Sequence, residues 1–412
     1  MKRRSRKHLL AMALTLAILP AAVAAMNVLV DPYRAYQDVS LTMFEAHRRT
    51  RGRRSKAILL ERGDWQVVLM GSSRCETALD PGHPGLAGQR VFNLGLNRYN
   101  VSELALQLEY AARHNRLQHA IICLDFFGFN QLRHYDEQFD PLDYTPARAL
   151  AARRTGSIEF SHSRFNPERN RFFDHASMLL GRDVTSDSIK LVRRMIDGKP
   201  NSYTTTGLRM SHRKPGGTRR LFAKSLTAAM RSTINYRGWR YGRAHRDAIQ
   251  KIVSLSRQRG FPLTFLILPI HALQHEAIHA EGLWDDWEKW MRDLASIVDR
   301  GNASSTESST VTLWSFQEYN RFTTETVPQE DDDRTPRKYF HESSHCSRAV
   351  GNAVLDRITG RSEPQDEPFG VRLSGATMDQ HFAAVRAARE AYRQQYPDQI
   401  AFFDEVVSEF DR

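Results

Sequence analysis

Short apolar runs alternate with longer amphipathic segments along most of this chain. Five runs are predicted to be strands: Trp65 to Met70, Val91 to Leu94, Ala120 to Asp125, Leu263 to Leu268 and Val311 to Trp314. These runs lack the period of two that a half-exposed strand shows, which indicates strands covered on both faces. Strands that alternate with helices in this way form a parallel sheet between two helical layers. The sequence therefore predicts a three-layer α/β fold built on a parallel sheet.

The helical segments and one irregular region divide the chain into parts. Helices are expected over Val101 to His114, Ser186 to Ile196, Arg243 to Arg259, Ala272 to Val298, Arg348 to Thr359 and Met378 to Gln395. The alternation fails between Gln131 and Arg240, a stretch rich in Arg, Ser and Thr. We interpret residues 131–243 as an insertion, serving as a lid or substrate-binding subdomain, between the two parts of the main domain, 37–130 and 244–361. Residues 1–36 form an N-terminal basic tip and anchor, and residues 362–412 a helical tail.

The N-terminus combines a basic tip with a long apolar run. Five cations between Lys2 and Lys7 precede Leu9 to Val30, a run without a charged residue. Such a run can span a bilayer, and the cationic flank favours a cytoplasmic tip. A secretory signal cleaved near Ala24 is the alternative. We expect an uncleaved, single-pass transmembrane helix in the inner (plasma) membrane, with the C-terminal domain periplasmic or otherwise extracytoplasmic.

Charge and cysteine content exclude several classes of protein. The net charge is +12, and the N-terminal tip carries five of those charges, so the remaining excess is mild and no nucleic-acid partner is expected. Only three cysteines occur, Cys75, Cys123 and Cys346, and no disulfide framework holds the fold. An oxidising compartment would permit a bond between Cys75 and Cys346, and Cys123 is interpreted as core. The chain has no glycine-rich phosphate loop and no cysteine-rich metal site, and no cofactor is expected.

The first predicted strand stops abruptly at Gly71-Ser72-Ser73-Arg74. A buried strand that ends there presents a serine hydroxyl at the carboxyl edge of a sheet, where open α/β folds place their ligands. Glycine permits the tight turn and the close approach of a substrate. The alternative is a pair of serines that caps a helix.

A second motif lies far along the chain, from Tyr339 to His345. Its carboxylate and histidine, Glu342 and His345, are three residues apart and provide a base and an orienting partner for a serine nucleophile. The same segment also matches the zinc motif His341-Glu342-x-x-His345, which requires a helix. Because the apolar spacing of the next helix begins only after Ser347, the triad interpretation is favoured. A solvated histidine-rich loop is the third alternative.

Four segments together resemble the SGNH (GDSL-like) hydrolase superfamily. They are Met70-Gly71-Ser72-Ser73-Arg74, Phe92-Asn93-Leu94-Gly95, Leu124-Asp125-Phe126-Phe127 and Glu342-x-x-His345. The likeness is greatest to membrane-anchored extracytoplasmic members related to alginate O-acetylation and teichoic-acid D-alanylation proteins. It implies a flavodoxin-like sheet with Ser73 as nucleophile, His345 as base and Glu342 as its orienting partner. The resemblance also implies an oxyanion hole from the Ser73 and Gly95 amides, with Asn130 in place of the family's third-block asparagine.

The resemblance predicts acyl-ester chemistry without a metal. Arg74 and His271 are candidate substrate-binding residues, and a structural histidine is the alternative for His271. The expected substrate is an O-acylated glycan or lipid of the cell envelope, and a membrane-bound acyltransferase is a possible partner. The sequence does not choose between hydrolysis and acyl transfer. A catalytically silent accessory protein, which binds an envelope polysaccharide in the same cleft, is the alternative from another class.

Overall fold

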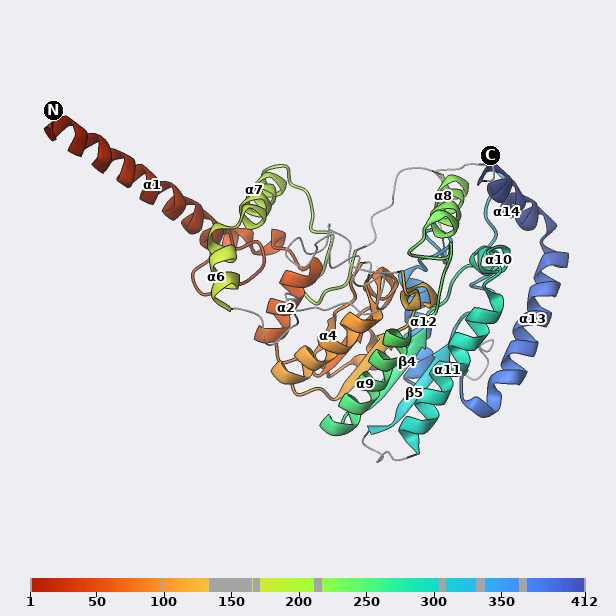
Figure 1. Ribbon diagram of the computed structural model, residues 1–412. Coiled ribbons are helices and arrows are strands. Elements are labelled where there is room, and N and C mark those ends of the chain that lie inside the picture. The colour runs from red at the N-terminus through yellow and green to blue at the C-terminus, as the bar shows by residue number, and fades with distance from the viewer. Residues whose placement is uncertain are drawn as a thin grey trace.

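A computed structural model gives the three-dimensional structure of the chain (Figure 1). It describes residues 2–97, 99–132, 165, 171–210, 217–303, 309–330, 338–362 and 369–410, and only the backbone of residues 2–15. The predicted basic tip therefore lies outside the described side chains, and parts of the predicted insertion and of the C-terminal tail lie outside the described residues. The predicted division into domains stays a prediction.

A six-stranded sheet forms the centre of the molecule, in the order β2-β1-β3-β4-β5-β6. Its strands are β1 (Val67–Met70), β2 (Val91–Asn93), β3 (His119–Cys123), β4 (Leu263–Ile267), β5 (Val311–Ser315) and β6 (Val371–Arg372). The first five strands are parallel. Their order is the doubly wound order 2-1-3-4-5, in which the switch point lies between β1 and β3.

The prediction of a parallel sheet is wrong at one edge. Strand β6 pairs antiparallel with β5 through Trp314↔Arg372 and Ser315↔Val371, and the sheet is mixed. Both residues of β6 are exposed. A two-residue edge strand has no buried apolar run, and the signal that identified the five parallel strands is absent from it.

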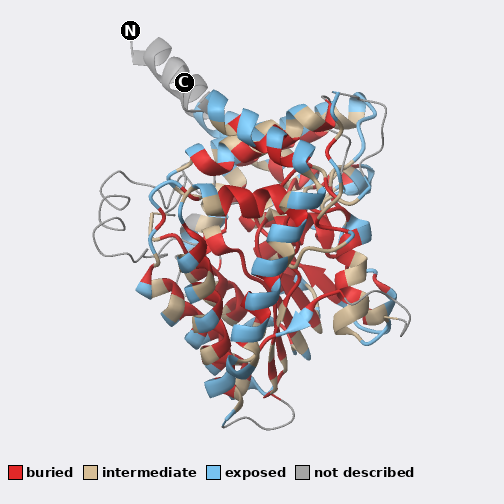
Figure 2. Ribbon diagram, turned by 90° about the vertical axis from the view of Figure 1, so that its right-hand side faces the viewer, coloured by how far each residue is buried: buried red, intermediate tan, exposed pale blue. Residues whose placement is uncertain are grey.

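Helices cover both faces of the sheet. On one face, α4 (Val101–His114), α9 (Arg243–Arg259) and α11 (Trp284–Asn302) lie side by side (Figure 1). On the other face, α3 (Ser73–Ala78) packs against α12 (Arg348–Ile358). This distribution is what right-handed crossovers between parallel strands produce. Figure 2 shows the buried residues gathered in the strands and on the inner faces of these helices.

One predicted helix is two helices in the structure. The segment Ala272 to Val298 contains α10 (Ala272–Ala280) and α11, which begins at Trp284. Gly282 between them has a φ of 67°, in the left-handed region that ends a helix. The three tryptophans of α11 are buried, as packing residues should be; they are Trp284, Trp287 and Trp290.

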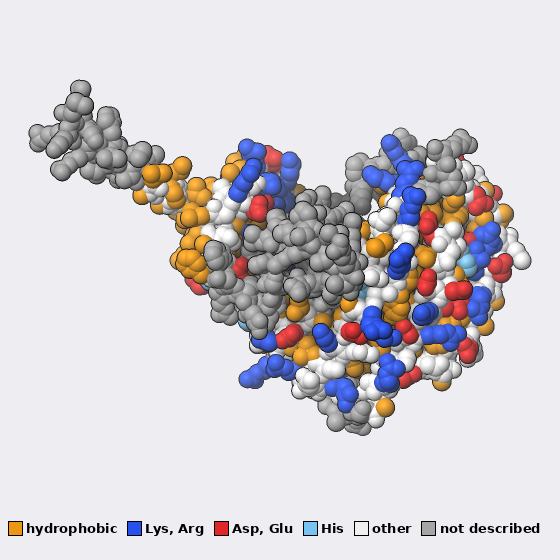
Figure 3. Space-filling model, viewed as in Figure 1, with side chains coloured by type: hydrophobic (Ala, Val, Ile, Leu, Met, Phe, Trp, Pro, Cys, Tyr) orange, Lys and Arg blue, Asp and Glu red, His pale blue; other side chains and the backbone are white. Residues whose placement is uncertain are grey.

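The N-terminal part groups helices around the base of α1 (Lys2–Val30). They are η1 (Thr42–His47), α6 (Arg171–Leu180) and α7 (Arg182–Ile196). Helix α2 (Gly52–Arg62) belongs to the main core, because it packs against α4 and buries Leu60 there. The buried Asn27 of α1 donates to Leu179 O at 2.9 Å and to Thr185 Oγ1 at 3.0 Å, which fixes the end of α1 against α6 and α7. Hydrophobic side chains are exposed on this part of the surface (Figure 3), and all the large exposed ones described lie there except Met210 and Val371.

The prediction of a transmembrane helix is wrong for the described part of the chain. No helix among the residues searched there is long and apolar enough to cross a membrane. The last turn of α1 is packed against protein, since Val30 is buried with Phe44 and Leu191. The cellular location stays a prediction.

The C-terminal helices α13 (Met378–Gln395) and α14 (Pro397–Phe410) form an outer layer on α10 and α11 (Figure 1). The Glu276 carboxylate of α10 accepts hydrogen bonds from Arg389 and Arg393 of α13 at 2.6 to 2.9 Å. Helix α14 also packs against α8 (Thr218–Arg231), a helix of the predicted insertion. This outer layer therefore holds α8 over the carboxyl end of the sheet.

Candidate active site

Ser73 stands at the carboxyl end of β1 because the chain turns sharply there. Gly71 has a φ of 144°, and a Cβ at this position would lie 2.8 Å from Cys123 Cβ. The Ser72 side chain then accepts a hydrogen bond from the Arg74 amide at 3.1 Å and caps α3. Ser73 is thus the first residue of α3, a position whose amide has no acceptor within the helix. Its hydroxyl and its amide both lie at the switch point of the sheet.

The second motif forms a tight loop just before α12. Phe340 and Cys346 make an antiparallel bridge, and the His341 amide donates to His345 O at 2.9 Å. The His271 amide, beyond the end of β4, donates to Ser343 O at 3.1 Å and ties the loop to the sheet. The loop is therefore fixed at both its base and its tip.

The structure brings the predicted nucleophile, base and carboxylate together. Ser73 Oγ lies 2.8 Å from His345 Nε2, across 272 positions of sequence. His345 Nδ1 contacts Glu342 Oε1. In the tautomer that fits both contacts, Nδ1–H donates to Glu342 and Nε2 accepts the serine proton, which is the arrangement of a catalytic triad.

The close approach of α12 to α3 explains how the two distant segments meet. Gly351 of α12 lies directly over α3, where a Cβ would come within 1.9 Å of Ala78 O. No other residue type fits there without a shift of one helix. The loop that ends in His345 is joined to α12 by only a few residues, so this packing places the imidazole beside Ser73.

The surroundings of Glu342 favour its ionised form. Its side chain is 9% exposed, and burial alone would raise its pKa. The charge of His345 outweighs that effect, with hydrogen bonds from Ser225 Oγ and the Ser344 amide, the latter at 2.9 Å. Together they lower the pKa of Glu342 to about 2. A carboxylate that stays charged can orient and stabilise an imidazolium.

A pocket of about 530 Å³ opens over this triad. Its walls come from the turn after β1, from the loop of Glu342 and from α8 with the segment that follows it. The residues from α8 and that segment are Leu221, Lys224, Ser225, Ala228, Ala229, Ser232, Ile234, Asn235 and Tyr236. This volume is in the range of small-ligand sites. The predicted insertion thus contributes a wall of the pocket.

Ser225 is a residue of the site that sequence reasoning missed. It lies on α8, and its hydroxyl donates to Glu342 Oε2. The hydroxyl also lies 2.9 Å from Ser343 Oγ, which donates to Gln274 Oε1 at 2.7 Å. No local motif marks Ser225, because only the packing of α8 over the loop gives it this role.

Arg74 is near the pocket but is engaged with protein groups. Its Nη1 donates to Asp125 Oδ1 at 2.9 Å, and its Nε and Nη2 donate to Ser344 Oγ at 3.1 and 2.8 Å. Burial would lower the pKa of Arg74, but neighbouring acidic groups, Asp125 foremost, raise it. The arginine therefore links the ends of β1 and β3 to the loop of His345. The structure places it as a positioning residue more than as a free substrate contact.

Three other predicted site residues are not where a direct role requires them. The Gly95 amide donates to Asn93 Oδ1 at 2.9 Å, and it is not directed at Ser73. The Asn130 amide group donates to Thr233 O and Asn235 O, at 2.9 and 3.0 Å. His271 is fully buried and caps α10, with Nε2 2.5 Å from Glu325 O, and burial lowers its pKa to about 4. These residues support the scaffold of the site.

Asn97 is a better-placed candidate for an oxyanion donor. The pairing of β1 with β2 matches Leu69 to Asn93, and the Leu96 amide donates to Gly71 O at 2.8 Å, so the pairing continues past both strands. The chain then reaches Asn97, which lines the pocket together with Ser73. Asn97 lies two residues after Gly95, to which the family motif directed attention.

The structure does not favour the zinc alternative. His341 to His345 form a bend and a bridge, and the helix starts only at Arg348. Both ring nitrogens of His345 are engaged, with Ser73 and Glu342. Among the described residues, no group of three or more His, Cys, Asp or Glu side chains is placed to hold a metal ion.

The three cysteines are buried and free. The bond considered between Cys75 and Cys346 is not formed. Burial raises the pKa of the Cys346 thiol to about 12 and that of the Cys123 thiol well above its ordinary value. Both thiols therefore stay protonated and serve as packing groups around the turn.

Comparison with known proteins adds no assignment. No protein-family model matches this chain, and a search of curated proteins found no matching relative. The argument about function therefore depends on the geometry of the site.

Proposed function

We propose that this chain is a serine esterase or O-acyltransferase of the SGNH type. The observation that carries the proposal is the line of contacts from Ser73 through His345 to Glu342 at the carboxyl end of β1. Such a line, opening into a pocket of suitable volume, is the arrangement that activates a serine hydroxyl. The resemblance of the four motifs to SGNH hydrolases supports the same conclusion.

In the proposed reaction, Ser73 Oγ attacks the carbonyl carbon of an acyl ester as its proton passes to His345 Nε2. Glu342 keeps the imidazole oriented and stabilises its positive charge. We assign the Ser73 amide and the Asn97 side chain, which line the same pocket, as the donors to the developing oxyanion. The tetrahedral intermediate then expels the alcohol, which takes the proton from His345, and leaves a seryl ester on Ser73. Water or a second hydroxyl repeats these steps in reverse and receives the acyl group.

The proposed substrate is an acyl ester of an envelope glycan or lipid, with a membrane-bound acyltransferase as a possible partner. The pocket supports a polar alcohol portion because asparagine, tyrosine and serine side chains line it. The silent accessory protein is the second candidate. It is favoured by the engagement of Gly95 and Asn130 with other protein groups, which removes two of the predicted oxyanion donors.

A Ser73→Ala variant separates the two candidates. We expect p-nitrophenyl acetate hydrolysis by the full-length chain to fall by ~10⁴-fold in kcat/KM, since removal of a triad nucleophile has effects of that order or larger. A Ser254→Ala variant, changed at an exposed serine of α9 outside the pocket, is the control and should keep its activity. A fluorophosphonate probe should label Ser73 in the unaltered protein. If neither turnover nor labelling depends on Ser73, the chain is a binding protein.

A further inference from the structure

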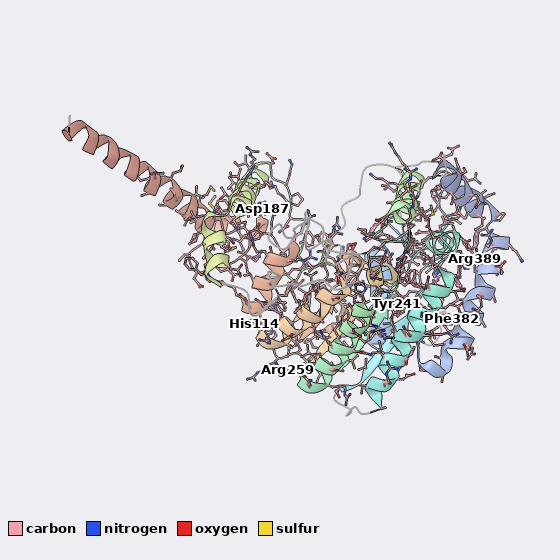
Figure 4. All side chains as sticks on the ribbon, in the orientation of Figure 1. His114, Asp187, Tyr241, Arg259, Phe382 and Arg389 are labelled. Atoms are coloured by element: carbon pink, nitrogen blue, oxygen red, sulfur yellow. The ribbon has the colours of Figure 1, made fainter. Side chains whose placement is uncertain are left out.

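A second pocket of about 400 Å³ lies beyond the end of β5, near the edge of the sheet that β6 forms. Glu318 and Tyr319 follow β5 and form one wall, and α13 forms the opposite wall. Figure 4 labels Phe382 and Arg389 on this helix. The pocket shares no lining residue with the pocket over Ser73. An inference about it therefore does not rest on the proposed function.

Two polar side chains in this pocket have atoms without a close hydrogen-bond partner. Both carboxylate oxygens of Glu318 are buried with no partner at hydrogen-bond distance among the described residues, and so is Nε2 of His381 on α13. The Ser315 hydroxyl lies near enough to lower the pKa of Glu318, but burial outweighs its effect. Glu318 Oε1 and His381 Nε2 face each other across 3.9 Å, which is too long for a hydrogen bond. An unsatisfied buried polar group costs about 1–3 kcal/mol. Two such groups that face each other in a pocket can both be satisfied by one donor group that binds between them.

The charge around Glu318 is also uncompensated. The arginines on the same helix are paired with other carboxylates, Arg386 with Glu288 and Arg389 and Arg393 with Glu276. Burial raises the pKa of Glu318 to about 7, and burial lowers that of His381 to about 4. At neutral pH the histidine is uncharged, and no cation of the described chain neutralises the carboxylate.

The remaining walls are apolar. Val371 of β6 and Ala384, Val385 and Ala388 of α13 supply them, and Thr377 and Gln380 add polar groups. Such a site suits a ligand with a short hydrocarbon body and one polar head group. The head group must donate a hydrogen bond to the ionised Glu318 carboxylate, and His381 Nε2 accepts a second one in the neutral tautomer that carries its proton on Nδ1.

We propose that this pocket binds a small organic cation, with a primary ammonium group between Glu318 and His381 and a short apolar body against α13. An ammonium group has three donors and no acceptor, so it satisfies both partners and supplies the missing positive charge. A hydroxyl group has only one donor and no charge. A metal ion would need a third protein ligand, which the described residues do not provide here.

Calorimetric titration of the full-length chain with n-butylammonium chloride tests the proposal. Neutral n-butanol, of the same length, is the matched probe. We expect a dissociation constant of about millimolar order for the ammonium, as its few heavy atoms allow, and at least about tenfold weaker binding of the alcohol. Glu318→Gln should weaken butylammonium binding by about tenfold or more. Glu390→Gln, which removes an exposed carboxylate of the same helix, should leave the dissociation constant unchanged.

Three results would overturn the proposal. They are no heat of binding up to about 50 mM butylammonium, equal binding of butylammonium and butanol, and equal binding by the unaltered protein and Glu318→Gln. Circular dichroism reports whether each variant folds. If Glu318→Gln does not fold, the comparison of the two probes on the unaltered protein decides by itself. The titration does not measure ester hydrolysis, and the binding result does not depend on Ser73.

Discussion

The carboxylates of two glutamates are buried near the carboxyl edge of the same sheet, and their surroundings shift their pKa values in opposite directions. Glu342 accepts hydrogen bonds from His345, Ser225 and the Ser344 amide, and its pKa falls to about 2. At Glu318 burial outweighs the Ser315 hydroxyl and a backbone amide, and the pKa rises to about 7.

The comparison teaches that burial alone does not decide the charge of a carboxylate. Burial opposes ionisation at both positions, and a neighbouring cation together with hydrogen-bond donors decides the result. At Glu342 the protein itself supplies His345 and the donors, which suits a group that must stay charged while it orients a base. At Glu318 the neighbouring groups do not offset burial, which suits a site that is completed by a ligand.

Replacement of Glu342 by Gln should have the largest effect. The amide keeps the shape of the side chain but cannot stabilise the imidazolium or select the tautomer, and the corresponding change in serine proteases costs ~10⁴-fold in kcat. We expect a loss of 10³- to 10⁴-fold (order of magnitude) in kcat for p-nitrophenyl acetate, measured at pH 8. A loss below about tenfold would mean that Glu342 only packs against His345.

The same variant also changes how the free energy of unfolding depends on pH below pH 4.5. Because the pKa of Glu342 is lowered in the folded state, its contribution is present above pH 4.5 and is lost as the pH falls toward 2. The contribution is about 3 kcal/mol at most, since one pKa unit is about 1.4 kcal/mol. Urea unfolding of both proteins at several pH values should show a free-energy difference that shrinks toward pH 2.

Replacement of Glu318 by Gln should have a smaller effect of opposite pH dependence. The folded-state pKa is raised, so the unaltered protein loses stability as the pH rises from 4.5 through about 7. We therefore expect the variant to be more stable than the unaltered protein at pH 8, by at most about 3 kcal/mol, and to differ little at pH 5. Urea unfolding at the two pH values measures this. A variant that is less stable at pH 8 would show that Glu318 has a partner in solution.

The sequence predicted those parts of the molecule that depend on local pattern. All five parallel strands carry short, mainly apolar runs, and the glycine after β1 marks the turn that presents Ser73. The proximity of Ser73 to His345 followed from the rule that ligands gather at the carboxyl edge of such a sheet. The two-residue β6 and the break at Gly282 were missed, because neither interrupts an apolar pattern strongly.

The donors of the site were harder to predict because tertiary packing decides them. Gly95 fits the family motif, yet its amide is engaged by Asn93 two residues earlier. Asn130 is held by the segment after α8, which no local pattern places there. The support of Glu342 by Ser225 depends on α14 and α10, which hold α8 over the loop. These facts could not be read from periodicity or spacing.

Replacement of Ser225 by Ala should have the smallest effect and tests the support of Glu342 most directly. The change removes one hydrogen bond to the carboxylate, worth about 1.5–3 kcal/mol to a charged group in stability, and leaves the contacts from His345 and the Ser344 amide. We expect kcat to fall by about three- to tenfold with KM nearly unchanged, because the carboxylate then holds the imidazole less firmly. As the pH is lowered, the loss of stability should begin at a higher pH, because one of the groups that lower the pKa of Glu342 is gone. Ser254→Ala is the control, and a variant of Ser225 that matches it in both kcat and acid stability would remove α8 from the catalytic arrangement.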